Sequence, residues 1–456
     1  MPHQDIIVAV ATPPGAGAIA VIRLSGPGCL TLLDKVFKGR TKPSAATPNT
    51  IIYGHIVDGQ SLVDEVLISV FCSPASYTGE DVAEISCHGS VFIQKSIIEL
   101  LIRTGAGIAA PGEFTQRAFL NGKKDLLQAE AVADLIAAES QAMHAVALNQ
   151  MRGGFSKELA GLRNKLIEFA SLIELELDFS QEDVEFANRN DLSALSNGII
   201  GRIEELISSF KLGNAIKNGI PVAIAGRPNA GKSTLLNALL NEDRAIVSEI
   251  AGTTRDTIEE RLIIEGIEFR IIDTAGLRQS NDTIEQMGVK KSYEKINLSA
   301  VLLYVFDISQ VAEKLEFDKE MAEALAFDVP CIFVANKVDE TSKPVVGSLK
   351  DIPNIIFISA KNGSGLEELK SALVTLSVGK NFNTQSVIVS NARHYEALIK
   401  TRQALLDVNN AMDMHIPADL MAIDLRKALF HLGEITGNIS TEELLGSIFG
   451  NFCIGK

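Results

Sequence analysis

Residues 220–240 carry the strongest chemical pattern in the chain. Their sequence, IPVAIAGRPNAGKSTLLNALL, reads as an apolar strand, a glycine-rich loop and a helix, and Gly226, Gly231, Lys232 and Ser233 match the spacing GxxxxGK(S/T). In such a loop the backbone N–H groups and the helix N-terminus bind nucleotide phosphates, the lysine reaches the β- and γ-phosphates, and the hydroxyl binds Mg²⁺. Because the required strand and helix both flank the pattern, we predict a nucleotide-binding loop rather than a chance match.

Two short motifs downstream supply groups for the metal and the γ-phosphate. The segment GTTRD (Gly252–Asp256) carries hydroxyl groups, and we expect Thr254 to complete the Mg²⁺ shell that Ser233 begins. The segment DTAG ends a predicted hairpin with the sequence IEERLIIEGIEFRII. There Asp273 would hold the metal through a water molecule, and Gly276 would donate its N–H to the γ-phosphate.

Two further motifs follow predicted strands and indicate which base is bound. Asn336, Lys337 and Asp339 come at the carboxyl end of CIFVAN, where open α/β sheets bind ligands. The Asp339 carboxylate can accept hydrogen bonds from N1–H and the 2-amino group of guanine, and adenine lacks these two donors. The strand NIIFI precedes three residues expected beside the base, namely Ser359, Ala360 and Lys361. Each motif is weak alone, but five in this order predict GTP binding.

One position departs from many small GTPases. After DTAG, where a glutamine often orients the attacking water, stands Leu277, and a leucine cannot polarise water. The catalytic group must therefore come from elsewhere. Asp282 and Glu285 are the nearest carboxylates, whereas Arg255 and Arg278 are alternative stabilisers of charge. Spacing alone does not choose among them, and all four suit a solvated loop equally well.

The motifs lie in a region where predicted strands and helices alternate. The segments on either side of it have a different sequence pattern. Residues 1–118 alternate short apolar runs with Gly and Pro, which predicts an α+β domain. Residues 119–218 and 379–456 repeat apolar residues at helical spacing, and each segment has an apolar face to bury. We therefore expect a multidomain α+β protein, with one helical bundle built from both segments and a P-loop, Ras-like α/β GTPase domain (219–378) inserted between them.

Composition places the chain among folded proteins of a reducing compartment. Of 456 residues, 46% are hydrophobic and 22% are charged, and no apolar run approaches the ~20 residues that span a bilayer. The net charge of −15 argues against a broad non-specific grip on nucleic acid, but not against a local basic patch. The five scattered cysteines form no CxxC pair and the first residues lack a basic signal region, so we expect a cytoplasmic protein with free thiols.

Several segments together resemble one known family. GRPNAGKST, GTTRD, DTAGLR and NKVD, with helical flanks, are similar to the tRNA-modifying GTPase family MnmE, also called TrmE. The flanks make the match close, because ATPPGAGAIAVIRLSG, YTGEDVAEISCHG, APGEFTQRAFLNGKKDLLQAEAVADLI and the terminal FCIGK also resemble signatures of that family. The resemblance covers essentially the whole chain, and the linkers are least alike.

The resemblance implies how GTP is hydrolysed without the glutamine. In the family, potassium-dependent dimerisation activates the GTPase domain, and the cation stabilises charge where other GTPases use an arginine. Its ligands here would be Asn229 and the backbone carbonyls of Ser248, Ile250 and Thr253. By the same match Glu285 would orient the water through another water, and Arg255 remains a candidate stabiliser of charge.

The motifs and the resemblance together predict one set of GTP-binding residues. They are Asn229, Ala230, Gly231, Lys232, Ser233, Thr234, Ser248, Thr253, Thr254, Asp273, Thr274, Ala275, Gly276, Asn336, Lys337, Asp339, Ser359, Ala360 and Lys361. Ser233 and Thr254 are the expected Mg²⁺ ligands.

The resemblance also implies a folate site in the N-terminal domain, for a one-carbon carrier such as 5-formyl- or methylene-tetrahydrofolate. Arg23, Glu84, Lys123 and Lys456 fall on the family's folate-contacting positions. Cations can pair with the glutamyl carboxylates and Glu84 can accept from the pterin, although any one of the four suits an ordinary surface charge. The family match favours Lys123 over its neighbour in NGKKDL. Cys453 is implicated in the modification, and the alternative is a small buried apolar residue.

The implied function joins GTP hydrolysis to tRNA chemistry. With a flavin-dependent partner, MnmG (GidA), a homodimer of the chain would form a heterotetramer or larger complex and add an aminomethyl or carboxymethylaminomethyl group at C5 of wobble uridine. FAD is expected on the partner only, since the chain has no convincing dinucleotide fingerprint. The rival readings are a ribosome-assembly GTPase without modification chemistry and a folate enzyme in which the GTPase is only regulatory.

Overall fold

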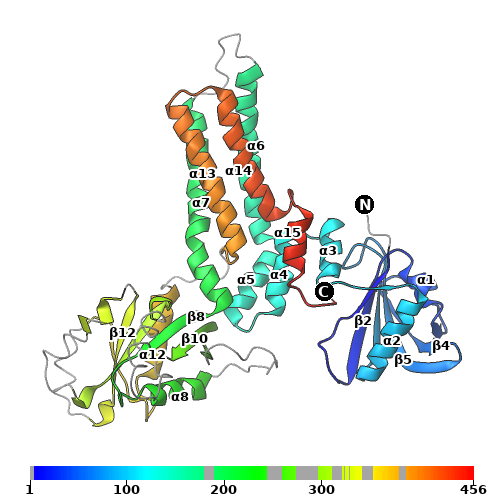
Figure 1. The fold of residues 1–456 in the computed structure, drawn as a ribbon, viewed down its shortest axis with the longest axis horizontal. Coiled ribbons are helices and arrows are strands. Elements are labelled where there is room, and N and C mark those ends of the chain that lie inside the picture. Colours follow the sequence, from blue (N-terminus) through cyan, green and yellow to red (C-terminus); the bar gives the residue numbers. More distant parts are fainter. Residues whose placement is uncertain are drawn as a thin grey trace, which may run out of the picture. The chain divides into compact units, whose positions relative to one another are not determined.

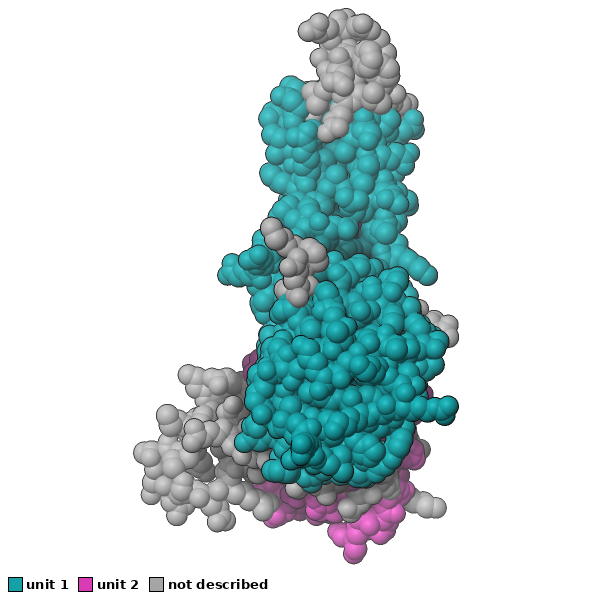
Figure 2. All heavy atoms as spheres, turned by 90° about the vertical axis from the view of Figure 1, so that its right-hand side faces the viewer, with its two compact units in different colours: residues 1–136, 148–202, 397–456 teal, residues 137–147, 203–396 magenta. Residues whose placement is uncertain are grey.

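The computed structural model describes residues 5–178, 189–243, 259–273, 296–310, 321–322, 324–327, 329–340, 353–378 and 387–455 (Figure 1). Its contacts divide the chain into two compact units, which Figure 2 distinguishes by colour. Unit 1 comprises residues 1–136, 148–202 and 397–456, and unit 2 comprises residues 137–147 and 203–396. Three helices (α5, α7 and α13) contribute residues to both units.

A seven-stranded sheet forms the N-terminal part of unit 1, in the order β3-β4-β5-β6-β2-β1-β7. Its strands are β1 (Ile7–Val10), β2 (Ile19–Ser25), β3 (Phe37–Gly39), β4 (Thr50–Asp58), β5 (Ser61–Phe71), β6 (Val82–His88) and β7 (Gly107–Ile108). Two helices, α1 (Cys29–Leu33) and α2 (Val91–Thr104), pack on this sheet. The predicted α+β architecture is confirmed here.

Alternation of side chains explains why this sheet buries one face. In β5 the side chains of Val66, Ile68 and Val70 are buried, whereas Leu67 between them is 46% exposed. Successive side chains of a strand point to opposite faces, so the buried set lies on the side covered by α1 and α2. The opposite face of the sheet is left uncovered by those helices.

The helical part of unit 1 combines segments from both sides of the inserted α/β region. Its helices are α3 (Glu113–Leu120), α4 (Leu126–Ile136), α6 (Gly154–Asp178), α14 (Ala418–Thr436) and α15 (Glu442–Phe449), together with the unit 1 parts of α5 (Gln141–Met151), α7 (Arg189–Asn218) and α13 (Ala392–Asp413). α14 packs against α6 and α4, and α15 packs against α3. The two-segment helical bundle is thus confirmed, while the residue boundaries of the three domains stay a prediction.

The pairing of α6 with α14 follows from their apolar spacing. The buried residues of α6 include Leu159, Leu162, Leu166, Phe169 and Ile173, and those of α14 include Met421, Leu425, Ala428, Leu432 and Ile435. Steps of three and four residues place each set along one side of its helix. Burying these two stripes against each other joins chain that precedes the α/β region to chain that follows it.

Unit 2 is built on a six-stranded sheet in the order β13-β12-β11-β8-β10-β9. Its strands are β8 (Ile220–Ala225), β9 (Glu259–Ile264), β10 (Ile267–Asp273), β11 (Val301–Asp307), β12 (Cys331–Asn336) and β13 (Ile355–Phe357), and its helices include α8 (Lys232–Asp243) and α12 (Leu366–Val378). All neighbouring pairs are parallel except β9 with β10. β12 is buried along its whole length, as expected for a parallel strand covered on both faces.

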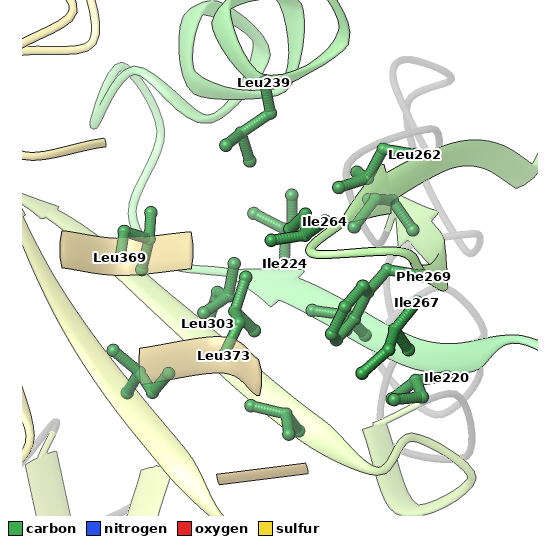
Figure 3. Close-up of a cluster of buried hydrophobic side chains, with 14 of the residues drawn as sticks. Ile220, Ile224, Leu239, Leu262, Ile264, Ile267, Phe269, Leu303, Leu369 and Leu373 are labelled. Carbon is green, nitrogen blue, oxygen red and sulfur yellow. The ribbon is translucent and has the colours of Figure 1, made fainter. Parts of the chain in front are cut away.

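The predicted hairpin is the antiparallel pair β9–β10. Ile264 pairs with Ile267, which leaves Glu265 and Gly266 as a two-residue turn, and both have positive φ angles, +50° and +77°. Figure 3 shows apolar side chains of the hairpin, such as Leu262 and Phe269, in the same cluster as Leu239 of α8 and Leu369 of α12.

A segment far from the α/β region in sequence completes this core. Ala142, Met143 and Val146 of α5 belong to the same buried cluster, and so does Ile388 beyond α12. The N–H of Ala142 donates to the carbonyl of Gly266 at 2.9 Å, which fixes the start of α5 to the β9–β10 turn. Within the described ranges, no helix is both long enough and apolar enough to cross a membrane.

Candidate functional site

Two glycines let the loop between β8 and α8 approach neighbouring strands closely. Gly226 has a φ of +135° and Gly231 a φ of +92°, conformations that favour glycine. A Cβ on Gly226 would lie 1.9 Å from the carbonyl oxygen of Val305, and one on Gly231 would lie 2.2 Å from Nδ2 of Asn336. Both glycines of the predicted phosphate loop are therefore required by its packing against β11 and β12.

The side chain of Lys232 folds back onto the backbone of its own loop. Nζ of Lys232 donates to the carbonyls of Gly226 at 2.6 Å and Arg227 at 2.7 Å. Lys232 is the first residue of α8, and the exposed Ser233 and Thr234 follow in its first turn. An ammonium, two hydroxyls and a helix N-terminus thus converge, which is the chemistry that binds phosphate.

Asn336 links the phosphate loop to the segment after β13. Its side chain is 2% exposed, and Nδ2 donates to the carbonyl of Ala230 at 2.9 Å. Oδ1 accepts from the N–H of Ala360 at 3.0 Å. Three predicted motifs, far apart in sequence, are thereby joined by one buried amide.

The predicted base-recognising carboxylate is exposed beside that amide. Asp339 lies in a short 3₁₀ helix, Val338–Glu340, and its carboxylate accepts a hydrogen bond from the Ser359 side chain. That hydrogen bond, helped by Lys361 and Lys337, holds the pKa of the Asp339 carboxyl below its usual range. The group is therefore ionised at neutral pH, as two hydrogen bonds from guanine require.

One residue that the sequence reasoning missed contacts the predicted lysine. Asp307 ends β11, and its Oδ2 lies 2.6 Å from Nζ of Lys337. The signal was present as an acid at the carboxyl end of the buried strand AVLLYVFD, the position where open α/β sheets bind ligands.

Part of the predicted site lies outside the described residues. This applies to Ser248, Ile250, Thr253, Thr254, Arg255, Thr274, Ala275, Gly276, Leu277, Arg278, Asp282, Glu285 and Lys456, and to the side chain of Asp273. The backbone of Asp273 is described and ends β10. Asn229 is exposed in the phosphate loop with a φ of +63°.

A second constellation lies in unit 1, where predicted folate positions come together. Arg23 of β2 and Glu84 of β6 are register partners, and the guanidinium donates to Oε1 of Glu84 from Nε at 2.9 Å and Nη2 at 2.7 Å. The guanidinium carbon lies 5.2 Å from the ring centre of Tyr77 and 5.7 Å from that of Phe114. Charged and aromatic groups therefore meet on one part of the sheet.

The C-terminal tail reaches the same constellation. Nη1 of Arg23 donates to the carbonyl of Gly455 at 3.4 Å, and the N–H of Gly112 donates to the carbonyl of Cys453 at 3.4 Å. Gly455 has a φ of +93°, and a Cβ there would lie 2.3 Å from the carbonyl oxygen of Val10. Cys453 itself is exposed, so its alternative reading as a buried apolar residue is wrong.

The two neighbouring lysines lie near this constellation in different ways. Nζ of Lys123 donates to the carbonyl of Pro74 at 3.0 Å, and Nζ of Lys124 lies 5.8 Å from the ring centre of Tyr77. Tyr77 is thus shared by Lys124 and Arg23. The choice of Lys123 for the folate stays a prediction.

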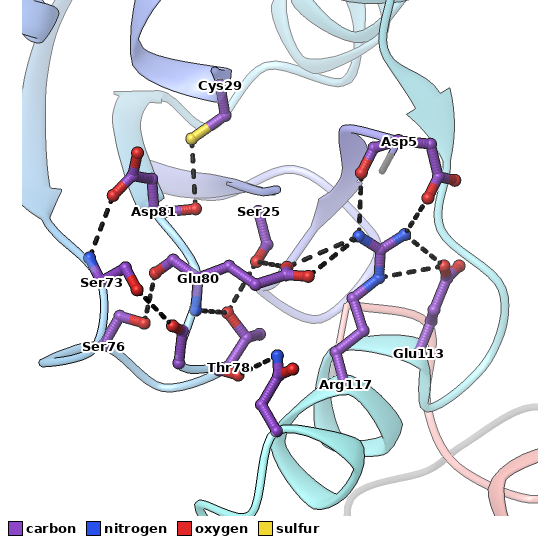
Figure 4. Close-up of polar contacts among 12 residues, drawn as sticks. Asp5, Ser25, Cys29, Ser73, Ser76, Thr78, Glu80, Asp81, Glu113 and Arg117 are labelled. Carbon is purple, nitrogen blue, oxygen red and sulfur yellow. Dashed lines mark hydrogen bonds and ion pairs between the residues drawn. The ribbon is translucent and has the colours of Figure 1, made fainter. Parts of the chain in front are cut away.

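A buried arginine, which sequence reasoning also missed, supports this region (Figure 4). The side chain of Arg117 in α3 is 0% exposed and forms ion pairs with Asp5, Glu80 and Glu113. Glu80 also accepts from the hydroxyl of Ser25 at 2.7 Å, two residues beyond Arg23 in β2. A buried cation is stable only when paired, so this network fixes α3, which begins beside the tail, to the sheet.

Comparisons with known proteins cover nearly the whole chain. The family described as "GTP-binding protein TrmE N-terminus" matches residues 6–123, and the family described as "MnmE helical domain" matches residues 126–453. A "tRNA modification GTPase MnmE" of Cytophaga hutchinsonii is 54% identical, over 100% of this chain and 98% of that protein. A protein of the same name from Bacteroides thetaiotaomicron is 48% identical, over 100% of both chains.

One similar solved structure matches a smaller part of the chain. Era from Aquifex aeolicus, bound to GDP and AlF4⁻, covers 41% of this chain and 66% of its own at 27% identity and a TM-score of 0.28. The two family matches together cover the segments that build the two constellations except Lys124 and Gly455, and the relatives match over the full length of the chain. The chain belongs to the MnmE family of tRNA modification GTPases.

Proposed function

We propose that this tRNA modification GTPase is activated by K⁺ and acts with a flavin-dependent partner of the MnmG (GidA) type. Together they would add an aminomethyl or carboxymethylaminomethyl group to C5 of the wobble uridine of tRNA, with the carbon drawn from a reduced folate. The observation that carries the proposal is the meeting of the C-terminal tail with the Arg23–Glu84 pair. This group of contacts is a candidate ligand site in addition to the GTP site, and GTP hydrolysis alone would need only the GTP site.

GTP and its metals fit the groups of unit 2. Asp339 offers the ionised carboxylate that guanine requires, Asn336 and Ser359 hold the surrounding segments in place, and Lys232 and Ser233 stand at a helix N-terminus. Ser233, with Thr254, would bind Mg²⁺. Both metal ions, when bound, supply positive charge against the phosphates.

The K⁺ site is proposed around Asn229, with Ser248, Ile250 and Thr253. The side chain of Asn229 is exposed, and its amide oxygen is the kind of hard ligand that K⁺ accepts. In this proposal Glu285 orients the attacking water and Arg255 stabilises charge.

A reduced folate fits the donor set of unit 1. Arg23 is a partner for glutamyl carboxylates, Glu84 can accept from the N–H groups of a pterin, and Tyr77 and Phe114 provide apolar ring surface. Lys123 and Lys456 would add cations for the same carboxylates. When bound, the folate supplies the one-carbon unit, and the role proposed for these residues is to bind and orient it.

A homodimer is supported by the uncovered face of the N-terminal sheet. Ile51, Tyr53 and Leu67 are 66%, 57% and 46% exposed, and Tyr53 pairs directly with Leu67 across β4 and β5. Large apolar side chains gathered on an exposed sheet face mark an interaction surface. We assign it to a second copy of the chain, so that Tyr53→Glu should lower the mass in sedimentation from dimer to monomer.

The remaining parts of the proposal concern the assembly. The partner would hold FAD and much of the tRNA-binding surface in a heterotetramer or larger complex in the cytoplasm. Residues 1–118, 119–218 with 379–456, and 219–378 would be the dimerisation and folate domain, the helical domain and the GTPase domain. Cys453, exposed in the tail beside the folate positions, is the proposed catalytic thiol.

Mass spectrometry of wobble nucleosides tests the function directly. A deletion strain should lack the C5 modification, and the intact chain should restore it, whereas an Arg23→Ala chain with normal GTP hydrolysis should not. Unchanged wobble nucleosides together with accumulated ribosomal subunits would identify a ribosome-assembly GTPase instead. Full restoration of the modification by the Arg23→Ala chain would mean that the folate does not bind at Arg23.

A further inference from the structure

We propose that Asp307 is a positioning residue for guanine nucleotides, which acts by holding Lys337 in its binding conformation before the nucleotide arrives. The proposal rests on GTP binding by the segment Asn336–Asp339. It does not depend on the K⁺, folate or partner proposals.

The topology of the sheet brings the two residues together. β11 and β12 are parallel neighbours, and Asp307 pairs with Asn336 at their carboxyl ends. Lys337 follows Asn336 directly, and its Nζ reaches Oδ2 of Asp307 at 2.6 Å. The contact therefore lies at the ligand-binding edge of the sheet, although the two residues are 30 positions apart in the chain.

The Asp307 carboxylate is held more firmly than an ordinary surface acid. Its residue is 6% exposed, and Oδ1 accepts from the N–H of Ser309 at 2.9 Å and from the Ser309 hydroxyl at 2.6 Å. Oδ2 accepts from Nε2 of Gln310 at 3.1 Å, in addition to Nζ of Lys337. Four donors fix the position of the carboxylate, so it acts as an anchor rather than as a mobile counter-ion.

The backbone of Lys337 needs such an anchor. Its φ of +66° is in the left-handed region, which is uncommon for a residue other than glycine, asparagine or aspartate. Such conformations persist where the surroundings determine them and cluster at ligand sites. On one side Asn336 is fixed by Ala230 and Ala360, and the Asp307 ion pair fixes Lys337 itself.

The electrostatics of the pair agree with this geometry. Burial disfavours ionisation of Asp307, but hydrogen bonds from Lys337 and Ser309 outweigh it and leave the pKa of the carboxyl below its usual value. The same hydrogen bond raises the pKa of the Lys337 ammonium. Because the carboxylate balances the charge of Lys337, the residue can offer its stem and its N–H groups to the base.

A double-mutant cycle on the full chain tests the proposal. The four proteins are the intact chain, Asp307→Asn, Lys337→Met and the double variant, and the measurements are the Kd for a fluorescent GDP and the kcat and KM for GTP. We expect each single variant to weaken GDP binding about tenfold, the usual scale for losing a charged hydrogen bond. The Asp307→Asn variant should raise KM while kcat at saturating GTP is kept.

The Kd of the double variant shows whether the two residues act together or independently. If Asp307 acts through Lys337, the Kd of the double variant for GDP should not exceed the larger of the two Kd values of the single variants. Losses that multiply to about a hundredfold would mean that the two residues act independently, and would overturn the proposal. An unchanged Kd in Asp307→Asn would also overturn it.

A matched control separates positioning from general damage. Glu268→Gln neutralises another nearly buried carboxylate, which pairs with the cation of Arg261. Glu268 lies near the start of β10, whereas Asp307 lies at the carboxyl end of its strand in the same sheet. The Glu268→Gln variant should change thermal unfolding but leave the Kd for GDP unaltered. Should Asp307→Asn fail to fold, Asp307→Glu keeps the charge while displacing it by one methylene group, and a Kd equal to that of the intact chain would contradict the role.

Discussion

Arg23 and Gly455 are 432 positions apart in the chain, yet the guanidinium of Arg23 donates to the carbonyl of Gly455 at 3.4 Å. The same guanidinium pairs with Glu84. The second strand of the N-terminal sheet and the end of the helical segment thus build one group of contacts. Arg23 therefore links the sheet to the C-terminal tail through a single side chain.

Gly112 gives a way to move the tail without touching a charged group. Its φ is +66°, and a Cβ there would lie 2.7 Å from the carbonyl oxygen of Phe449 and 3.0 Å from Cβ of Phe452. We expect Gly112→Ala to weaken binding of 5-formyltetrahydrofolate roughly tenfold, since small displacements in a ligand site are costly. Calorimetry measures the affinity, and GTP hydrolysis should be unchanged.

Gly59, in the turn between β4 and β5, is the matched control for that substitution. Its φ of +61° imposes a similar backbone strain on alanine, but a Cβ there meets nothing within 4 Å. Gly59→Ala should therefore retain the folate affinity of the intact chain. Equal losses in both variants would show that backbone strain, and not the tail, accounts for the effect.

Asn336 is expected to be essential for nucleotide affinity as well as for local stability. Asn336→Ala removes the side-chain partner of two buried backbone groups, the carbonyl of Ala230 and the N–H of Ala360. This loss should lower the free energy of unfolding by about 1–3 kcal/mol. We expect GDP to bind about 10- to 100-fold more weakly, as 1.4 kcal/mol corresponds to a factor of ten. Asn237→Ala, an exposed asparagine of α8, should bind GDP normally.

Hydrolysis should depend on the monovalent cation and on one glutamate. GTP turnover should be faster in K⁺ than in Na⁺, and Asn229→Ala should remove the difference. Glu285→Ala should abolish turnover while GTP still binds, because only the water loses its orienting group. Asp282→Ala is the control, and equal rates in the two salts would exclude the cation site at Asn229.

Cys453 should be the first thiol to react with iodoacetamide. It is exposed, whereas burial raises the pKa of Cys29 and Cys331 to about 12 and that of Cys87 to about 11. The thiolate is the reactive form, so the three buried thiols should react slowly at pH 8. Peptide mass spectrometry locates the label, and a bound reduced folate should slow labelling of Cys453 but not of the half-buried Cys72.

Asp307 should contribute to the pH dependence of stability. Its folded-state pKa is lowered, so its contribution is present above the unfolded pKa of about 4 and is lost as pH falls through the folded value. The difference in unfolding free energy between the intact chain and Asp307→Asn should be largest near neutral pH and shrink below about pH 4. Urea unfolding across this range measures it, and a difference independent of pH would contradict the lowered pKa.

The sequence predicted those parts of the fold and site that are encoded locally. Gly226 and Gly231 were identified because a phosphate loop needs glycine at that spacing, and the structure places both against neighbouring strands. The β9–β10 hairpin followed from two apolar runs around Glu265 and Gly266. Short elements such as β3 and β7 were not anticipated, because two or three residues carry no measurable period.

Contacts between distant segments could not be derived in the same way. No periodicity links Asp307 to Lys337 or Arg117 to Asp5, since these pairs depend on which strands and helices become neighbours. The meeting of the tail with Arg23 was expected only from family resemblance. Many of the residues predicted to bind the metal ions and the γ-phosphate or to orient the water, Glu285 among them, lie outside the described residues and stay predictions.

The sharing of one core by residues 142–146, the β9–β10 hairpin and Ile388 has a consequence for synthesis on the ribosome. The α5 segment emerges more than a hundred residues before its hairpin partner, and Ile388 emerges later still. Domains generally fold as units when their chain is complete. The nascent α/β region therefore cannot close its core until residue 388 has left the exit tunnel, and a fragment cut at residues 219 and 378 would expose the apolar surface that α5 and Ile388 cover.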